Sequence, residues 1–474
     1  MSGFVKEMIF SVPSALVESQ AAEVRLQPTT GTAAYTTPGS TLEFRQDILP
    51  NTFGDMSNTL VLTGRVVFGN VTNANRSQLL GTFASLFSTI RVRIGGVLVD
   101  EIVNFSQLMM HLFDCTLTQS DRRMLSGMLG FDPIVPSGQG VILGPNNNAN
   151  GATPNSSHSW TPHSTQYSFA IPIPCSLTNT STLWPLFCSQ IQWEFVMADP
   201  VNYTVTNAGA GTIPTVTISQ AELVFNTLRL ADGPFKTLMG MQPVQPDGSL
   251  LIKTDSWVYT NGAIPAQQAA GRWDIPIAAS YKSISRMLIT STPADVAEKS
   301  FGGVNPNLSS GQLVVNNRLY PALPCRLSEP AEVLYQNYKS FGSLYSTSHV
   351  GSMDLYSFAK SSGVFPLHTP YNPDGTLLGT PIVMPDGATG FATTPLRNAI
   401  LSHNKWKWCL DLESLVNNKE SLFAGISTRG TGNSVLRLTI GAQLPNQAHT
   451  VHIWMNIQMV LRLNINTFQC VVDY

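Results

Sequence analysis

The chain has 474 residues, of which 43% are hydrophobic and 9% aromatic, so it can bury a sizeable core and is not a disordered segment. Only 12% are charged, about half the share of an average soluble domain, which argues against long solvated helices. The 27 Lys and Arg nearly balance the 29 Asp and Glu, and no basic run occurs. Because phosphate contacts need clustered cations, we expect no direct sequence-specific nucleic-acid binding.

Targeting and redox signals are weak. Met1 to Pro13 lacks the cationic start and the small-residue cleavage site of a secretion signal, and no apolar run reaches the roughly 18 residues of a membrane span. We therefore expect neither secretion nor membrane crossing. The six cysteines lie far apart and form no C-x-x-C pair, so buried free thiols are expected rather than a zinc site or a disulfide framework.

In the first half of the chain, most apolar residues alternate with polar ones. This period of two predicts strands at 42–44, 90–94, 167–173 and 191–195. Helical spacing is confined to two short stretches, 79–87 and 102–113. A long polar stretch over 132–164 reads as a loop that offers a contact surface.

The second half shows the same alternation of apolar and polar residues. Alternation predicts strands at 284–289, 406–412, 436–440 and, most clearly, over 451–465, which reads as a long half-buried strand. The spacing of Leu334, Tyr338 and Phe341 predicts a helix, with Ser328 as its N-cap, Pro330 near its first turn and Gly342 as its stop. The stretches 291–320 and 360–397 read as long loops.

The two halves also repeat each other at an offset of roughly 230 to 240 residues. Residues 169–184 align without gaps on 408–423, and Leu228-Arg229-Leu230 matches Leu461-Arg462-Leu463. Each half further has a strand before a helix, which we equate as 90–94 before 102–113 and 284–289 before 331–341. Turn signals in 231–249 mark the boundary between the halves.

These patterns predict an all-β protein made of two tandem eight-stranded jelly rolls, a double jelly roll, with short helices and long inserted loops. The predicted domains are an N-terminal arm at 1–29, a first jelly roll at 30–232 and a second at 233–474.

Catalytic signatures are not found, and we expect no enzyme activity, no cofactor and no metal site. His449 and His452 form an H-x-x-H pair, but strand alternation separates their side chains, which favours a solvent-facing or interface histidine over metal binding. The acidic pairs Asp100-Glu101 and Asp411/Glu413 could serve a glycosidase, yet Asp411 lies on a polar strand face where a solvated charge is expected.

Trp406 and Trp408 could stack on sugars but read as core residues. Arg91 and Arg93, on the outer face of their strand, read as solvated side chains or a subunit contact.

Four ordered motifs carry a resemblance to a known family. They are Ser85–Gly96 followed by Asp100–Leu108, Ile171–Pro174 with Leu183–Leu186, Asn307–Pro321 followed by Glu329–Gly342, and Leu410–Glu413 with Gly425–Thr428. In this order they resemble the double jelly-roll major capsid proteins of icosahedral viruses, including polinton-like viruses, virophages and the adenovirus-type lineage. The resemblance covers roughly residues 40 to 465. It departs at Gly311, where the family usually has an aromatic residue before Gln312, and after Asn464, where a glycine turn is missing.

The resemblance implies a structural protein of the virion capsid shell, made and assembled inside the host cell. Three chains would form a homotrimer, a pseudo-hexagonal capsomer that tiles an icosahedral shell. Its partners would be neighbouring capsomers, penton proteins and minor capsid proteins. An internal membrane would be a further possible partner. The apolar residues Phe4, Met8, Ile9 and Phe10 would lie on the inner side of the shell, as interface residues.

Two other classes of protein share the β-rich composition. One is a tandem jelly-roll glycan-binding protein or glycan hydrolase, because a fold does not decide a function. The other is the coat of a single-stranded RNA virus, which predicts two dissimilar domains and commonly a basic arm. This sequence has two similar halves and no such arm.

Overall fold

The structure is a computed structural model. It describes residues 19–29, 34–70, 77–79, 81–118, 121, 124–130, 142–143, 166–180, 182–206, 214–241, 247–277, 280–293, 303, 305–341, 381–383, 389–391, 406–413, 425–429, 434–442, 444 and 448–473. Phe4, Met8, Ile9 and Phe10 lie outside this range, and so do most of the predicted loops 132–164 and 360–397.

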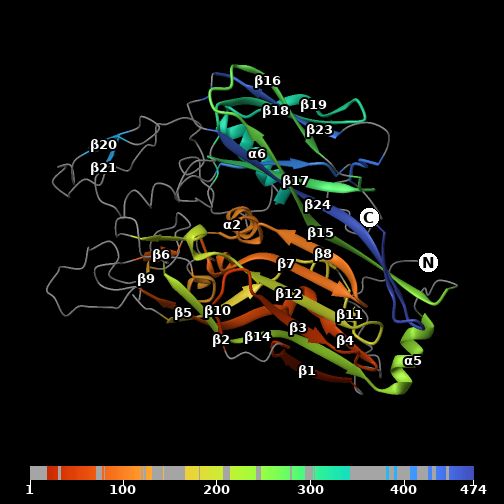
Figure 1. The fold of residues 1–474 in the computed structure, drawn as a ribbon. Coiled ribbons are helices and arrows are strands. Elements are labelled where there is room, and N and C mark those ends of the chain that lie inside the picture. The colour runs from red at the N-terminus through yellow and green to blue at the C-terminus, as the bar shows by residue number, and fades with distance from the viewer. Residues whose placement is uncertain are drawn as a thin grey trace.

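The first half folds into two antiparallel sheets packed face to face (Figure 1). One sheet has the order β10-β5-β14-β4-β11, with β1 and β2 also paired to β14, and the other has the order β3-β12-β7-β8. The strands of the first are β1 Ser19–Leu26, β2 Ala34–Tyr35, β4 Thr52–Asp55, β5 Val61–Gly69, β10 Gln166–Pro172, β11 Trp184–Pro185 and β14 Thr215–Leu230; those of the second are β3 Thr41–Gln46, β7 Phe87–Ile94, β8 Val97–Val103 and β12 Ile191–Met197. Aromatic rings join the two sheets, as in the contact of Trp193 with Phe225 at 6.2 Å between centroids.

The second half repeats this arrangement. One sheet has the order β15-β24-β17-β22, with β25 at the end of β24, and its partner has the order β16-β23-β18-β19. Their bounds are β15 Ser249–Ile264, β16 Gly271–Ile277, β17 Ile284–Pro293, β18 Leu308–Val315, β19 Arg318–Arg326, β22 Trp408–Asp411, β23 Ser434–Ile440, β24 His449–Asn464 and β25 Cys470–Asp473.

The remaining elements are short. They are α1 Met56–Thr59, β6 Ser77–Leu79, the 3-10 helix η3 Phe83–Leu86, α2 Phe105–Thr116, α4 Ser126–Leu129, β9 Ile142–Leu143, the 3-10 helix η5 Pro200–Asn202, β13 Thr204–Thr206, α5 Asp232–Met241, α6 Pro330–Phe341, β20 Pro381–Val383 and β21 Thr389–Phe391. The predicted helix over 79–87 is therefore a short strand, a 3-10 turn and the start of β7. In the part of the chain that the structure describes, no helix is long and apolar enough to cross a membrane.

The two halves share one strand order, which confirms the predicted double jelly roll. The eight main strands in chain order are β1, β3, β5, β7, β8, β10, β12 and β14 in the first half, and β15, β16, β17, β18, β19, β22, β23 and β24 in the second. In each half the first sheet contains the first, third, sixth and eighth of these strands. A helix follows the fifth strand in each half: α2 follows β8, and α6 follows β19. The predicted repeat is correct for β10 with β22 and for β14 with β24. It is wrong for 284–289, because β17 corresponds to β5, and the counterpart of β7 is β18.

Periodicity missed strand β18, because it read the stretch 291–320 as a loop, and only the resemblance carried by Asn307–Pro321 implied a strand there. In the first four residues of β18, Leu308-Ser-Ser-Gly311, the leucine is followed by three small residues, so large apolar side chains do not alternate there. The reason is packing: a Cβ built on Gly311 would lie 2.5 Å from the ring of Trp408 on the facing sheet. The indole occupies the space that a side chain on this strand would need.

The predicted boundary at 231–249 contains the helix α5, Asp232–Met241, which the turn signals concealed. Gly233-Pro234 reads as a turn, but proline is tolerated in the first turn of a helix, where its missing N–H costs nothing. The predicted arm at 1–29 includes β1, which pairs along its whole length with β14.

Strand β24 is buried on both faces in its middle, so the prediction of a half-buried strand is wrong there. Ile453, Met455 and Ile457 face the core of the second jelly roll, as alternation predicts. On the opposite face, Trp454 and Asn456 are also buried. The first jelly roll lies against that face (Figure 1).

Candidate functional site: the seam between the jelly rolls

The two jelly rolls meet along a continuous contact that we call the seam. It is formed by α2 and β8 of the first jelly roll and by β15, β24, residues 406–409 and α6 of the second. Figure 1 shows α2 lying between the two sandwiches. Ten of the twelve residues of α2 are buried, including the polar Gln107, His111 and Asp114, because both jelly rolls cover the helix.

A buried ion pair crosses the seam. The Nζ atom of Lys407 lies 2.5 Å from Oδ2 of Asp114 on α2, and the two side chains are 0% and 6% exposed. Asn337 on α6 fixes the backbone on either side of the lysine: its Nδ2 donates to the carbonyl of Lys407 at 3.0 Å, and its Oδ1 accepts from the N–H of Cys409 at 2.8 Å. The ammonium is thus positioned by both the second jelly roll and its helix.

A group of rings lies beside this pair. The ring of His111 on α2 lies 5.6 Å from the ring of Trp454, and the ring of His452 stacks on the same tryptophan at 5.7 Å. Both ring nitrogens of His452 have hydroxyl partners, Tyr259 at 2.9 Å and Thr292 at 2.8 Å. Burial lowers the pKa of His452 to about 4, so the ring is neutral at pH 7.

The H-x-x-H pair does not form a metal site. The Nδ1 atom of His449 is 3.2 Å from the Ser291 hydroxyl, on the other face of β24 from His452. Burial lowers the pKa of His449 to about 4. Within the described residues no group of His, Cys, Asp and Glu has the arrangement of a metal site. His452 is therefore an interface histidine, one of the two readings that the sequence favoured.

His111 is the least satisfied group of the seam. It is 1% exposed, and neither of its ring nitrogens has a hydrogen-bond partner among the described residues. Burial, reinforced by the positive charge of Lys407, lowers its pKa well below the ordinary value. The ring is therefore neutral and packs as an aromatic side chain against Trp454.

A second polar cluster ties β8 to β15. Oδ2 of the buried Asp100 accepts from the backbone N–H of Ser176 at 2.7 Å, and the hydroxyl of Thr254 donates to the carbonyl of the same serine. Nearby, Nδ2 of Asn179 donates to the carbonyl of Asp255 at 3.3 Å. Burial raises the pKa of Asp100, and it raises that of Asp255 to about 6.

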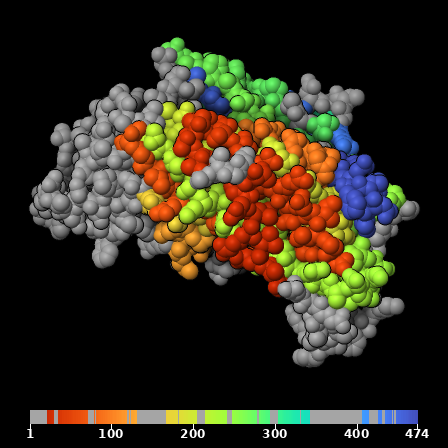
Figure 2. Space-filling model, turned by 60° about the horizontal axis from the view of Figure 1, so that its bottom comes forward, coloured from red at the N-terminus to blue at the C-terminus, as the bar shows by residue number. Residues whose placement is uncertain are grey.

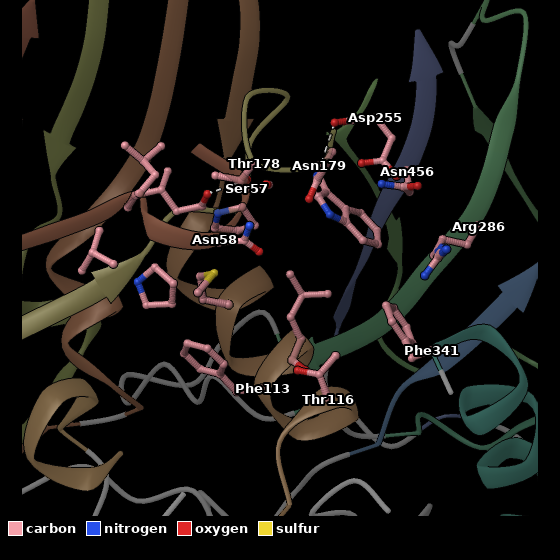
Figure 3. Close-up of a pocket in the computed structure, with 18 residues that line it drawn as sticks. Ser57, Asn58, Phe113, Thr116, Thr178, Asn179, Asp255, Arg286, Phe341 and Asn456 are labelled. Atoms are coloured by element: carbon pink, nitrogen blue, oxygen red, sulfur yellow. Dashed lines mark hydrogen bonds between the residues drawn. The ribbon is translucent and has the colours of Figure 1, made fainter. Parts of the chain in front are cut away.

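A cavity of about 410 Å³ opens between the jelly rolls next to this cluster (Figure 3). Its lining is Ser57, Asn58, Leu60, Val61, Met109, Leu112, Phe113, Thr116, Pro172, Ile173, Pro174, Thr178, Asn179, Asp255, Trp257, Arg286, Phe341 and Asn456. In Figure 3, Arg286 and Phe341 lie on one side and Ser57 and Asn58 on the other. The guanidinium of Arg286 lies 5.5 Å from the ring of Phe341. The lining pairs no nucleophile with a histidine base, so this cavity is suited to packing or binding rather than to covalent catalysis.

The structure places Arg91 and Arg93 on the face of β7 opposite the buried Ile90, Val92 and Ile94. Nε of Arg91 is 2.8 Å from Glu101, and Nε of Arg93 is 2.9 Å from Glu194. Both arginine side chains are 35% exposed. They are half-buried and paired within their own sheet.

The other predicted candidates are structural. Asp100 and Glu101 point to opposite faces of β8, so they form no catalytic pair. The prediction that Asp411 is a solvated charge is wrong: its side chain is 10% exposed and lies 3.6 Å from Lys339 of α6, because that helix covers the strand.

Trp406 and Trp408 are 3% and 0% exposed and belong to the core. All six cysteines are buried, and none of them forms a disulfide bond in the structure.

Sequence reasoning did not identify Asp114, Lys407 or His111. Two signals could have found them. Trp454 interrupts the polar face of an otherwise regular alternation, and Lys407 stands between two tryptophans that are both in the core. A large aromatic on a polar strand face, and a charge inside an apolar segment, both indicate a second layer of protein.

Comparison with known proteins agrees with this architecture. No protein-family model matches the sequence, and no curated protein matches it either. Solved structures do match. The PBCV-1 virus capsid has a TM-score of 0.53 at 12% identity, over 96% of this chain and 97% of that one. The Faustovirus major capsid protein has a TM-score of 0.53 at 8% identity, over 98% and 93%. A chain of the Sputnik virophage structure has a TM-score of 0.52 at 11% identity, over 96% and 88%. The chain therefore has the double jelly-roll fold of the major capsid proteins of icosahedral viruses.

Proposed function

We propose that this protein is a structural major capsid protein whose homotrimers form pseudo-hexagonal capsomers that tile an icosahedral shell. The observation that carries the proposal is the pairing, in one chain, of two jelly rolls with identical strand order across a buried seam. Two similar sandwiches per chain let three chains approximate sixfold symmetry. The match to capsid proteins over nearly the whole length of both chains supports it.

The test is the solution mass of the recombinant chain, by size exclusion with light scattering. One chain has a mass of 51.4 kDa, so a trimer has about 154 kDa. We expect a stable species near that mass, and hexagonal blocks in negative-stain electron microscopy. A clean monomer at all concentrations would contradict the proposal.

We further propose the division into an N-terminal arm at 1–29 and jelly rolls at 30–232 and 233–474, in which β1, the folded end of the arm, supplies the first strand of the first jelly roll. The apolar side chains of Phe4, Met8, Ile9 and Phe10 would contact a minor protein, a neighbouring capsomer or a membrane on the inner side of the shell. Deleting residues 1–18, which precede β1, should leave the trimer intact and impair shell assembly. Normal shells from the truncated chain would overturn this assignment.

The glycan-binding alternative gains no support from the site. Its best candidates for sugar stacking, Trp406 and Trp408, are buried in the core, and the acidic pairs do not converge. We propose no enzymatic activity. The assembly partners would be neighbouring capsomers, penton and minor capsid proteins. A glycan array that gave specific binding would reopen the alternative.

A further inference from the structure

The cavity between the jelly rolls has two apolar walls. In the first jelly roll, Leu112 and Phe113 follow Met109 by three and four residues, so all three lie on one side of α2. In the second, the rings of Trp257 and Phe341 are nearly parallel, with an interplanar angle of 17° and centroids 6.3 Å apart. A volume of about 410 Å³ and a largely apolar lining are typical of small-molecule sites, which span roughly 300–1,000 Å³.

Arg286 is the cation of this cavity, and its charge has no anionic partner. Its guanidinium carries five N–H donors, yet it forms no hydrogen bond and no ion pair with the residues that the structure describes. Its contact is with the ring of Phe341, 5.5 Å away (Figure 3). Other polar side chains of the lining donate hydrogen bonds within the chain, namely Ser57, Asn58, Thr116, Thr178 and Asn179. The donors of Arg286 are therefore available to a ligand.

Asp255 is the acid of the lining, and it limits which anion can bind. Burial raises the pKa of Asp255 to about 6, although the nearby charge of Arg286 lowers it. The Oδ1 atom of Asp255 is buried and has no hydrogen-bond partner among the described residues. At pH 7 the carboxylate is therefore mostly ionised, and it repels an anion placed at Arg286. A phosphate monoester, with nearly two negative charges, is repelled more strongly than a carboxylate with one.

The cavity lies inside the molecule, away from the broad outer sheet surface of the first jelly roll that Figure 2 shows, with β1 in red beside β14 in yellow-green. Its lining comes from both jelly rolls: α2 from the first, and β15, β17 and α6 from the second. A ligand held there contacts both halves of the chain at once. Because such a ligand binds only the folded chain, it stabilises the joined arrangement.

We propose that this cavity binds an amphipathic carboxylate, a molecule with one carboxylate group on an apolar body. The carboxylate accepts two parallel N–H···O bonds from Arg286, whose planar fork matches its geometry. The apolar body lies between α2 and the rings of Trp257 and Phe341, where it is removed from water. This inference goes beyond the proposed function and does not depend on assembly, because every residue of the site belongs to one chain.

Titration calorimetry of the full chain at pH 7 tests the proposal, with octanoate as the probe. We expect saturable binding at one site per chain and a Tm that rises with octanoate concentration. Three probes share the same apolar chain and differ in the head group: 1-octanol, octylammonium and octyl phosphate. Each should bind at least about tenfold more weakly than octanoate, because the neutral or positive heads do not pair with Arg286 and the phosphate is repelled by Asp255.

Four variants separate the contributions of the lining. Arg286→Met keeps an apolar stem but removes the charge, and should weaken octanoate binding at least about tenfold. Leu112→Trp fills the cavity from α2 and should abolish binding. Asp255→Asn removes the repelling charge and should strengthen binding severalfold. Arg326→Met is the control, because Arg326 has a side chain 74% exposed and lies outside the cavity.

Circular dichroism and thermal melting compare the folding of each variant with the wild type. If Arg286→Met does not fold, Leu112→Trp and Asp255→Asn still decide the question, because they change binding in opposite directions. No saturable binding of octanoate, equal binding of 1-octanol, or unchanged binding by Arg286→Met would overturn the proposal. So would tighter binding of octylammonium that Asp255→Asn removes, which would make the cavity a site for cations. Each of these results leaves the proposed capsid function standing, since that function is tested by the mass of the assembly.

Discussion

The ion pair of Asp114 and Lys407 offers the sharpest test of how the seam is held. Replacing Lys407 by Met keeps the length and the apolar stem of the side chain but leaves the Asp114 carboxylate, 6% exposed, without its counter-charge. Removing one partner of a buried pair typically costs about 3–5 kcal/mol, because the remaining charge is neither hydrated nor paired. For a domain of this size, 1 kcal/mol corresponds to about 2–4 °C in Tm, so we expect a fall on the order of 10 °C.

The matched control removes both charges. In Asp114→Leu with Lys407→Met no charge is left buried, and the backbone bonds of Asn337 to residues 407 and 409 remain. We expect this double variant to melt within a few degrees of the wild type, since replacing a whole buried pair by apolar residues is often neutral. The assay is thermal unfolding followed by calorimetry at pH 7.

The result that refutes this reasoning is a single variant that melts within about 2 °C of the wild type at pH 7. Such a result would mean that water reaches Asp114, and that the seam is held by apolar packing alone. A double variant as unstable as the single one would show instead that side-chain shape, not charge, is what the seam requires.

Three further predictions follow from the same packing. His449 and His452 have folded pKa values of about 4, against roughly 6.5 in the unfolded chain, so between these values the unfolded state binds more protons. We therefore expect Tm to fall as the pH drops from about 6.5 to 4. His452→Gln should reduce the slope of Tm against pH. Gly311→Ala should lower the stability of the protein by about 1–3 kcal/mol, because the new methyl group clashes with Trp408. Gly127→Ala is the control, because a Cβ atom there has no other atom within 4 Å. Equal melting temperatures of the two variants would contradict this prediction. Arg91→Ala and Arg93→Ala, which break partly exposed pairs, should each cost about 1 kcal/mol or less in urea unfolding.

Much of the fold could be predicted from periodicity, because strands with one buried face have to alternate. The repeat of β10 in β22 and of β14 in β24 is visible for that reason. Where packing depends on a distant residue, the pattern fails. Gly311 is explained only by Trp408, about one hundred positions away, and the helix α5 only by the freedom of proline in a first turn.

The seam was less predictable than the fold. Alternation reports one buried face, and by itself it does not distinguish a strand whose second face meets another domain from one whose second face meets water. Trp454 and Lys407 are the two local hints, but Asp114 and Lys407 are 293 residues apart. A pair so far apart cannot be recognised without the topology that brings α2 to β22.

The distance between those two residues also sets an order for folding during synthesis. Every strand of the first jelly roll comes from residues before 231, so this sandwich can form while the second half is still being made. Part of the cover of α2 is Lys407, and at about 5–20 residues per second synthesis takes on the order of 15–60 s to proceed the 293 residues from Asp114 to Lys407. Throughout that interval Met109 and Phe113, which line the cavity between the jelly rolls, lack the cover of the second half. The helix that joins the two jelly rolls in the folded protein is therefore an exposed apolar surface in the nascent chain.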